Sequence, residues 1–138
     1  MSSDDQLARL RRLPVFATLD DNVLERVLAV SSELECPPGY VFIRADDPGA
    51  GMFVLEEGTV VVEAPGRTFE LGPGEFFGEL SLLVPDSRRV ARVRAKTPVR
   101  CVAINRIEFE KLLEDEPRVA RAMLPVVAGR LWHVIHAK

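Results

Sequence analysis

Glycine and proline interrupt the middle of this chain every few residues. Between Leu34 and Ile104, short runs rich in β-branched and aromatic residues alternate with turns such as Pro38-Gly39 and Gly72-Pro73-Gly74. That pattern is typical of many short strands in a β-sandwich or roll. The clearest predicted strands are Tyr40–Arg44, Met52–Glu56, Thr59–Glu63, Thr68–Leu71, Ala91–Lys96 and Val99–Ile104.

Helices are predicted on both sides of this region. Before it, the segment Leu19–Val30 carries apolar residues at helical spacing and an aspartate near its start. After it, Asn105 can cap a helix over Arg106–Glu114. Pro117 opens a last helix that reaches about His136, in which Pro125 and Gly129 predict a kink or a break.

These elements predict a mainly β protein. With 138 residues, the chain is long enough for one domain around one core. We expect a single domain over residues 1–138, in which N-terminal helices occupy 1–33, a β-roll occupies 34–104 and C-terminal helices occupy 105–138. The roll is expected to be of the jelly-roll, or double-stranded β-helix, type.

Composition excludes several classes of protein. Hydrophobic residues make up 47% of the chain and charged residues 28%, which is an ordinary balance for a soluble globular domain. The net charge of −3 gives no general argument for nucleic-acid binding. The polar N-terminus does not resemble a signal peptide, and no apolar run approaches the roughly 20 residues of a membrane span. We therefore expect a cytoplasmic protein with no membrane partner.

The segment FFGEL, with an arginine about ten residues later, carries the strongest functional signal. Gly78 lets a backbone approach a ligand closely, Glu79 can accept hydrogen bonds from a sugar hydroxyl, and Arg89 offers a planar cation to a phosphate. Strand alternation places Arg89 on the apolar side of the following strand and Arg88 on the solvated side. A pairing of Arg89 with Glu79 alone, without a ligand, remains the structural alternative.

The stretch FGELSLL-x5-R-x-A over Phe77–Ala91 resembles the phosphate-binding cassette of the cyclic nucleotide-binding domain family. The segments Pro38–Phe42 and Asp47–Gly49 resemble the glycine-marked turns of that family, and Met52–Val60 resembles its strand-turn-strand signature. The likeness covers about residues 12–130. It departs from the usual pattern at Asp46, Ser81 and Val90, where glycine or other small residues are common.

The resemblance implies a sensor of a 3′,5′-cyclic nucleotide, cyclic AMP in the first place and cyclic GMP in the second, with no metal and no catalysis. Val90 favours cyclic AMP, because members that prefer cyclic GMP often carry serine or threonine there. A C-terminal lid would relay binding. The implied ligand-binding residues are Phe77, Gly78, Glu79, Leu80, Ser81, Arg89, Val90 and Ala91, and the lid residues are Leu131, Trp132 and Ile135.

Two alternatives remain. The chain could be a member that has lost ligand binding and serves dimerisation or protein interaction, which Val90 and the interrupted last helix favour. A metal enzyme on a similar roll is disfavoured, because the only histidines, His133 and His136, lie beyond the strands. We expect no DNA-reading domain after the last helix, and a homodimer or an effector protein as partner.

The remaining apolar residues and the basic run have structural interpretations. Cys36 and Cys101 are expected to be small buried residues. Phe53, Phe69 and Phe76 are expected in the core. The basic run 88–100 is expected to be a solvated strand face, because no aromatics interleave with it.

Overall fold

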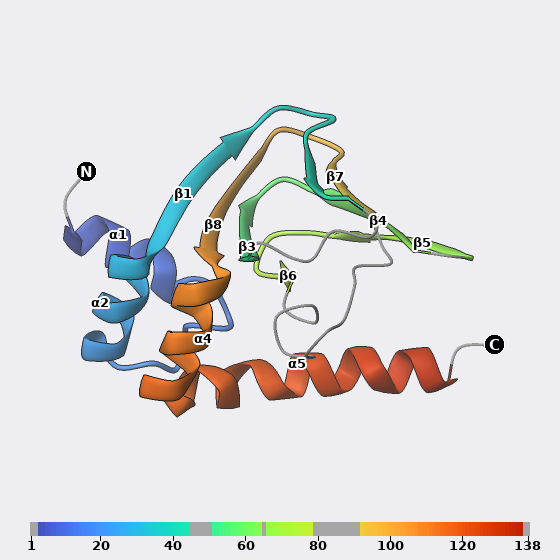
Figure 1. Ribbon diagram of the computed structural model, residues 1–138. Helices are drawn as coiled ribbons and strands as arrows, with labels where there is room; N and C mark the ends of the chain where they lie inside the picture. Colours follow the sequence, from blue (N-terminus) through green and yellow to red (C-terminus); the bar gives the residue numbers. More distant parts are fainter. Residues whose placement is uncertain (1–2, 45–50, 65, 79–91, 137–138) are drawn as a thin grey trace.

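The structure, a computed structural model, describes residues 3–44, 51–64, 66–78 and 92–136. For residue 3 and residues 131–136 it describes only the backbone. Within these residues, two helices precede the strands and two follow them (Figure 1). The helices are α1 (Ser3–Arg11), α2 (Asp21–Val30), α4 (Arg106–Asp115) and α5 (Pro117–His136). The strands are β1 (Ser31–Cys36), β2 (Val41–Ile43), β3 (Gly51–Glu57), β4 (Val60–Ala64), β5 (Arg67–Leu71), β6 (Phe76–Phe77), β7 (Arg92–Ala95) and β8 (Val99–Asn105).

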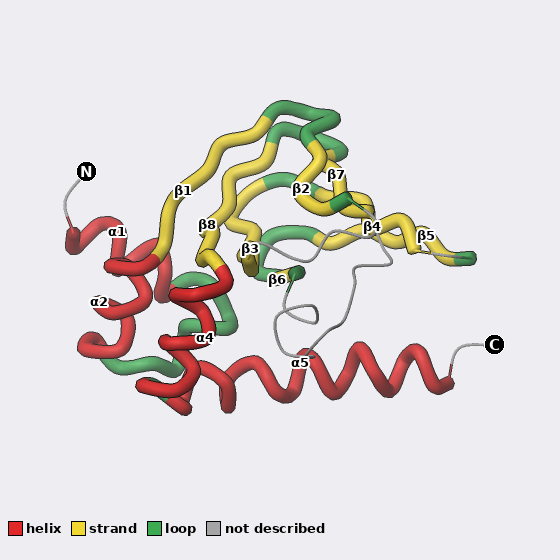
Figure 2. The backbone as a smooth tube through the Cα atoms, viewed as in Figure 1, coloured by secondary structure: helices red, strands yellow, loops and turns green. Residues whose placement is uncertain are grey.

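In the described residues the strands form two four-stranded antiparallel sheets, ordered β1-β8-β3-β6 and β2-β7-β4-β5. Both sheets curve around a common interior, which confirms the predicted β-roll (Figure 2). Two strands differ from the sequence prediction. Strand β1 starts at Ser31, before the predicted sheet region, and β6 is a two-residue strand that is not among the predicted strands.

The apolar interior has two parts. One lies between the helices and the first sheet, where Phe16, Leu24 and Phe109 are fully buried. The other lies inside the roll and is built from strand residues such as Leu55, Val60 and Cys101. Burial of this much apolar surface supplies the main stabilisation of the fold. Both cysteines are buried and free, as predicted.

The core prediction holds for one of the three phenylalanines and is wrong for another. Phe76 is fully buried, and Phe53 is partly buried against the interior of the roll. Phe69, however, is 37% exposed. It lies on β5, at the edge of the second sheet, where β4 is the neighbouring strand among the described residues. The guanidinium of Arg67 lies 5.1 Å from its ring centre.

The helix caps follow the sequence closely. Asp20 accepts a hydrogen bond from the N–H of Val23 at 3.0 Å and starts α2, while Asn105 accepts from the N–H of Glu108 at 2.9 Å and starts α4. Each cap satisfies a backbone donor that has no partner inside the helix.

Of the kink or break predicted in the last helix, the break does not occur, since α5 is continuous from Pro117 to His136. Its Val119 and Met123 are buried and Val127 packs against the same cluster, so contacts exist on both sides of Pro125. Tertiary packing of one face outweighs the weak local propensity here. Helix α5 then runs away from the other helices along the open side of the roll (Figure 1).

Candidate ligand-binding site

The described residues include the start of the predicted site and not its remainder. Phe77 and Gly78 are described, and they end β6 and begin the cassette, as we call residues 77–91. Glu79, Leu80, Ser81, Arg89, Val90 and Ala91 lie outside the described residues, as do the side chains of Leu131, Trp132 and Ile135. The structure therefore shows how the cassette is approached and where the backbone of the lid helix runs.

Strand β6 is anchored in both halves of the core. Its two residues point to opposite faces, as successive strand residues do. Phe76 enters the cluster beneath the helices, and Phe77 enters the interior of the roll. Pairing of Val54 with Phe76 and of Phe53 with Phe77 joins β6 to β3. The backbone that leads into the cassette is thus held from two sides.

Phe77 belongs to an aromatic group inside the roll. Its ring stacks on that of Phe53, with centroids 5.1 Å apart and planes 20° apart. Phe42 meets both rings edge-on at 5.4 Å, and Tyr40 meets Phe42 edge-on at 5.0 Å. Such pairs contribute beyond the area they bury, so Phe77 is a firm anchor for the cassette.

Gly78 has a conformation that a residue with a side chain adopts only under strain. Its φ angle is +95°, and a Cβ atom added to it would stand 2.5 Å from the carbonyl oxygen of Gly51. Both observations require glycine. The observed close approach is to the start of strand β3, so this glycine is needed by the fold. Its predicted approach to a ligand remains a prediction.

Arg130 ties helix α5 to the strand that precedes the cassette. Its guanidinium donates a hydrogen bond to the carbonyl oxygen of Phe76 and lies 4.7 Å from the centre of that residue's ring. The residue was absent from the sequence prediction. A signal existed, because Arg130 follows Val119, Met123 and Val127 on the packed face of the helix, where an apolar residue would be expected.

The basic strand residues do not form an open cationic surface in the described part of the chain. Val93 and Ala95 are buried while Arg92 and Lys96 are exposed, which confirms the predicted alternation along β7. Arg94 pairs with Glu63 at 3.1 Å and Lys96 with Glu70 at 2.7 Å, whereas Arg88 and Arg89 lie outside the described residues.

The thiols are unsuited to nucleophilic chemistry. Burial raises the pKa of Cys36, and it raises the pKa of Cys101 to about 12 with a smaller contribution from the neighbouring Cys36. The reactive form of cysteine is the thiolate, so both groups are inert at neutral pH.

Within the described residues, no three His, Cys, Asp or Glu side chains come together in a way that could hold a metal ion. No helix in this part of the chain is long and apolar enough to cross a membrane.

The described residues thus form a mainly β domain, a roll with helices at both ends and a glycine-dependent turn where β6 leaves the roll. Comparison with protein families identifies it further: the chain belongs to the cyclic nucleotide-binding domain family, whose model matches residues 33–116.

Similar proteins include ion channels and regulatory proteins. A cyclic nucleotide-gated potassium channel of Mesorhizobium japonicum is 35% identical over 108 residues, which cover 78% of this chain and 30% of the channel. The catabolite activator protein of Thermus thermophilus superposes with a TM-score of 0.76 at 28% identity, covering 88% of this chain and 59% of that one. The regulatory subunit of a cAMP-independent protein kinase A from Trypanosoma brucei superposes with a TM-score of 0.76 at 29% identity, covering 89% and 46%.

The chain spans about 30% of the length of the first curated relatives it matches, all of them potassium channels. The match is therefore to one domain of those proteins.

Proposed function

We propose that this chain is a sensing module that binds a 3′,5′-cyclic nucleotide in the cassette, with cyclic AMP as its preferred ligand and cyclic GMP as the second choice. Family membership supplies the ligand class. The supporting observation from the structure is the start of the cassette, where Phe77 is anchored in the roll and Gly78 rests on the backbone of Gly51. Residues that are already positioned add little to the ordering cost of binding, which favours a ligand site that begins at Phe77 and Gly78.

Each polar part of the nucleotide has a partner in this proposal. Glu79 accepts a hydrogen bond from the ribose 2′-hydroxyl, and Arg89 neutralises the cyclic phosphate through its planar fork. Backbone N–H groups near Leu80, Ser81 and Val90 complete the phosphate cradle, and Ala91 leaves room beside it. Val90 offers no hydroxyl to a guanine, which favours cyclic AMP.

Helix α5 relays binding in this proposal. Arg130 already links α5 to Phe76, two residues before Gly78. A change in the cassette on binding therefore acts on a segment that the helix contacts directly. The next turns of α5 carry Leu131, Trp132 and Ile135, which we propose close over the base as a lid. Such a relay needs only different contacts in the free and bound states.

A second candidate function is an interaction domain that no longer binds a nucleotide. Two observations favour it: Val90 is bulkier than the residues usual at its position, and one structure with the same fold is the regulatory subunit of a protein kinase A that is described as cAMP-independent. The partner in either case would be a second copy of the chain or an effector protein.

We further propose that the domain acts in the cytoplasm, without catalysis, by controlling a channel or regulator as its relatives' names suggest.

Calorimetric titration of the purified chain tests the proposal. Cyclic AMP should bind saturably, with one nucleotide per chain and a lower Kd than cyclic GMP, and cyclic di-GMP should serve as the control that does not bind. Binding of none of the three at millimolar concentration would support the interaction domain. A preference for cyclic GMP would overturn the role assigned to Val90 and leave the rest of the site standing.

A further inference from the structure

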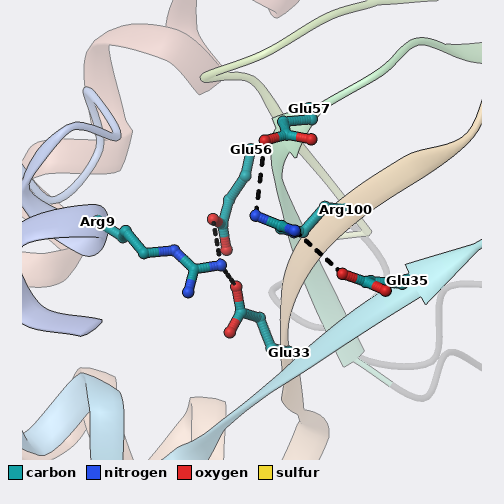
Figure 3. A network of polar contacts seen from close by, with 6 residues as sticks. All are labelled: Arg9, Glu33, Glu35, Glu56, Glu57 and Arg100. Carbon is teal, nitrogen blue, oxygen red and sulfur yellow. Dashed lines mark hydrogen bonds and ion pairs between the residues drawn. The ribbon is translucent and has the colours of Figure 1, made fainter. Parts of the chain in front are cut away.

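Strand β3 contains an extra residue on the side that faces helix α1. Leu55 pairs with Cys101 and Glu57 pairs with Arg100, so Glu56 has no position of its own in the pairing with β8. A bulge of this kind turns a side chain away from the regular alternation of the strand. The side chain of Glu56 is 11% exposed, and one of its oxygens lies 3.5 Å from the guanidinium of Arg9 on α1 (Figure 3).

Glu56 shares its cation with a second carboxylate. Arg9 forms an ion pair with Glu33 of β1 as well as with Glu56, so one guanidinium serves two acids. The three side chains line a cavity of about 140 Å³ between α1 and the first sheet. Two carboxylates that share one cation repel each other when both are ionised, and the burial of Glu56 weakens the screening of this repulsion by water.

The other charged groups near Glu56 do not remove this excess of negative charge. Arg100 of β8 is already paired with Glu35 at 3.1 Å and with Glu57, the neighbour of Glu56, at 3.5 Å (Figure 3). Arg12 of the segment after α1 lines an adjacent groove together with Glu56 and Glu57. Among the described residues, no further acidic or basic side chain lines this cavity or this groove.

Burial raises the pKa of Glu56. The charge of Glu33 and a hydrogen bond between the two carboxyl groups raise this pKa further, whereas Arg9 and Arg100 lower it. The folded chain therefore keeps the proton of Glu56 to a higher pH than the unfolded chain does. Over that window the folded state binds more protons, so the free energy of unfolding falls as the pH rises.

The bulge is connected to the segment that leads to the cassette. The N–H of Leu55 donates to the carbonyl oxygen of Glu75, and the N–H of Gly74 donates to the carbonyl oxygen of Leu55, each at 2.8 Å. Pro14, in the loop after α1, lies against Gly74, where an added Cβ would meet its ring at 3.1 Å. The chain then passes through β6 into Gly78.

We propose that Glu56 and Glu33, bridged by Arg9, form a proton-binding joint. Uptake of one proton by the pair holds α1 against β3, and release of that proton loosens both α1 and the Leu55–Glu75 connection. This inference does not depend on which nucleotide the chain binds, or on whether it binds one.

Urea unfolding as a function of pH tests the joint, with Glu56→Gln and Glu57→Gln as a matched pair. Glutamine has the shape of a protonated glutamate, can accept from Arg9 and can donate to Glu33. Wild type and Glu56→Gln should have similar unfolding midpoints near the ordinary carboxyl range, about pH 4–5. The midpoint of the wild type should fall below that of Glu56→Gln as the pH rises to about 8. Glu57→Gln alters an exposed carboxylate and should follow the wild type. A constant difference between wild type and Glu56→Gln across this range would overturn the proposal.

Two spectroscopic measurements separate the joint from a general loss of stability. In a carbon-13 titration of the side-chain carboxyls, the apparent pKa of Glu56 should fall in Glu33→Gln and rise in Arg9→Gln. Hydrogen exchange compared at the same pH should be faster at Leu55 and Gly74 in the wild type than in Glu56→Gln near neutrality, and equal near pH ~5. If Glu56 titrates as an ordinary glutamate, the joint does not exist. Equal exchange at both pH values would show that its effect stops at α1, contrary to the proposal.

Discussion

At the residue scale, the proposed phosphate contact depends on one of two adjacent arginines. The alternation seen in β7, with Val93 and Ala95 buried and Arg92 and Lys96 exposed, supports an inward Arg89 and an outward Arg88 when it is extended toward the N-terminus. The two substitutions therefore form a natural pair.

Arg89→Ala should weaken cyclic AMP binding far more than Arg88→Ala. Removing a desolvated charge partner costs about 2–5 kcal/mol, or roughly one and a half to three and a half decades in Kd. Removing a solvated arginine costs only a few tenths of a kcal/mol. Calorimetric titration of both variants measures the difference, and equal losses would remove Arg89 from the site.

Glu79 can be tested through the ligand. A hydrogen bond to a charged group contributes about 1.5–3 kcal/mol, so 2′-deoxy cyclic AMP should bind the wild type more weakly than cyclic AMP by at least about tenfold. In Glu79→Ala the two ligands should bind alike. A preference for the 2′-hydroxyl that survives the substitution would assign ribose recognition to another residue.

At the scale of single elements, the turn after β6 should be intolerant of a side chain. Gly78→Ala combines an unfavourable φ of +95° with a clash against Gly51. Gly39→Ala is the control, because Gly39 has a φ of +88° and nothing within 4 Å of an added Cβ. The control should lose about 1–2 kcal/mol of stability, and Gly78→Ala clearly more. Urea unfolding measures the free energy of unfolding of both variants. Equal losses would mean that the backbone near Gly51 can shift to accept the added Cβ without loss of stability.

Arg130 should control how firmly α5 is held. Arg130→Ala removes a charged hydrogen bond to the Phe76 carbonyl and a cation–aromatic contact, together worth about 2–4 kcal/mol. Hydrogen exchange in residues 126–135 should accelerate, while the strands of the roll should keep their protection. Arg121→Ala, on an exposed position of the same helix, is the control. Unchanged exchange in Arg130→Ala would place the anchor of α5 elsewhere.

At the scale of the whole molecule, the alternation of turns and β-branched runs was enough to predict a roll with helices at both ends. Turn residues and caps act locally, so Asn105 and Gly74 could be interpreted from their neighbours alone, and the cap of α2 could be narrowed to Asp20 or Asp21. The strand pattern of β7 was predictable from the alternation of apolar and charged residues. The burial of the two cysteines was predictable from the apolar character of this side chain.

What depends on contacts between distant segments could not be predicted in this way. The pairing of β6 with β3 makes a strand of two residues, a run too short to be predicted as a strand from its sequence. The position of β5 at a sheet edge exposes Phe69, and packing on the core keeps α5 intact through Pro125. The bulge at Glu56 and the contact of Arg130 with Phe76 also arise only when separate elements meet. For the site itself, only Phe77 and Gly78 fall within the described residues, and the roles of the others remain predictions.

The most direct test of the account is hydrogen exchange of the whole chain with and without saturating cyclic AMP. The account predicts slower exchange in the cassette, residues 77–91, together with a changed rate in residues 126–135 of α5. Protection of the cassette alone would confirm the ligand and contradict the relay through α5. No change in either segment would contradict the central claim that this chain senses a cyclic nucleotide.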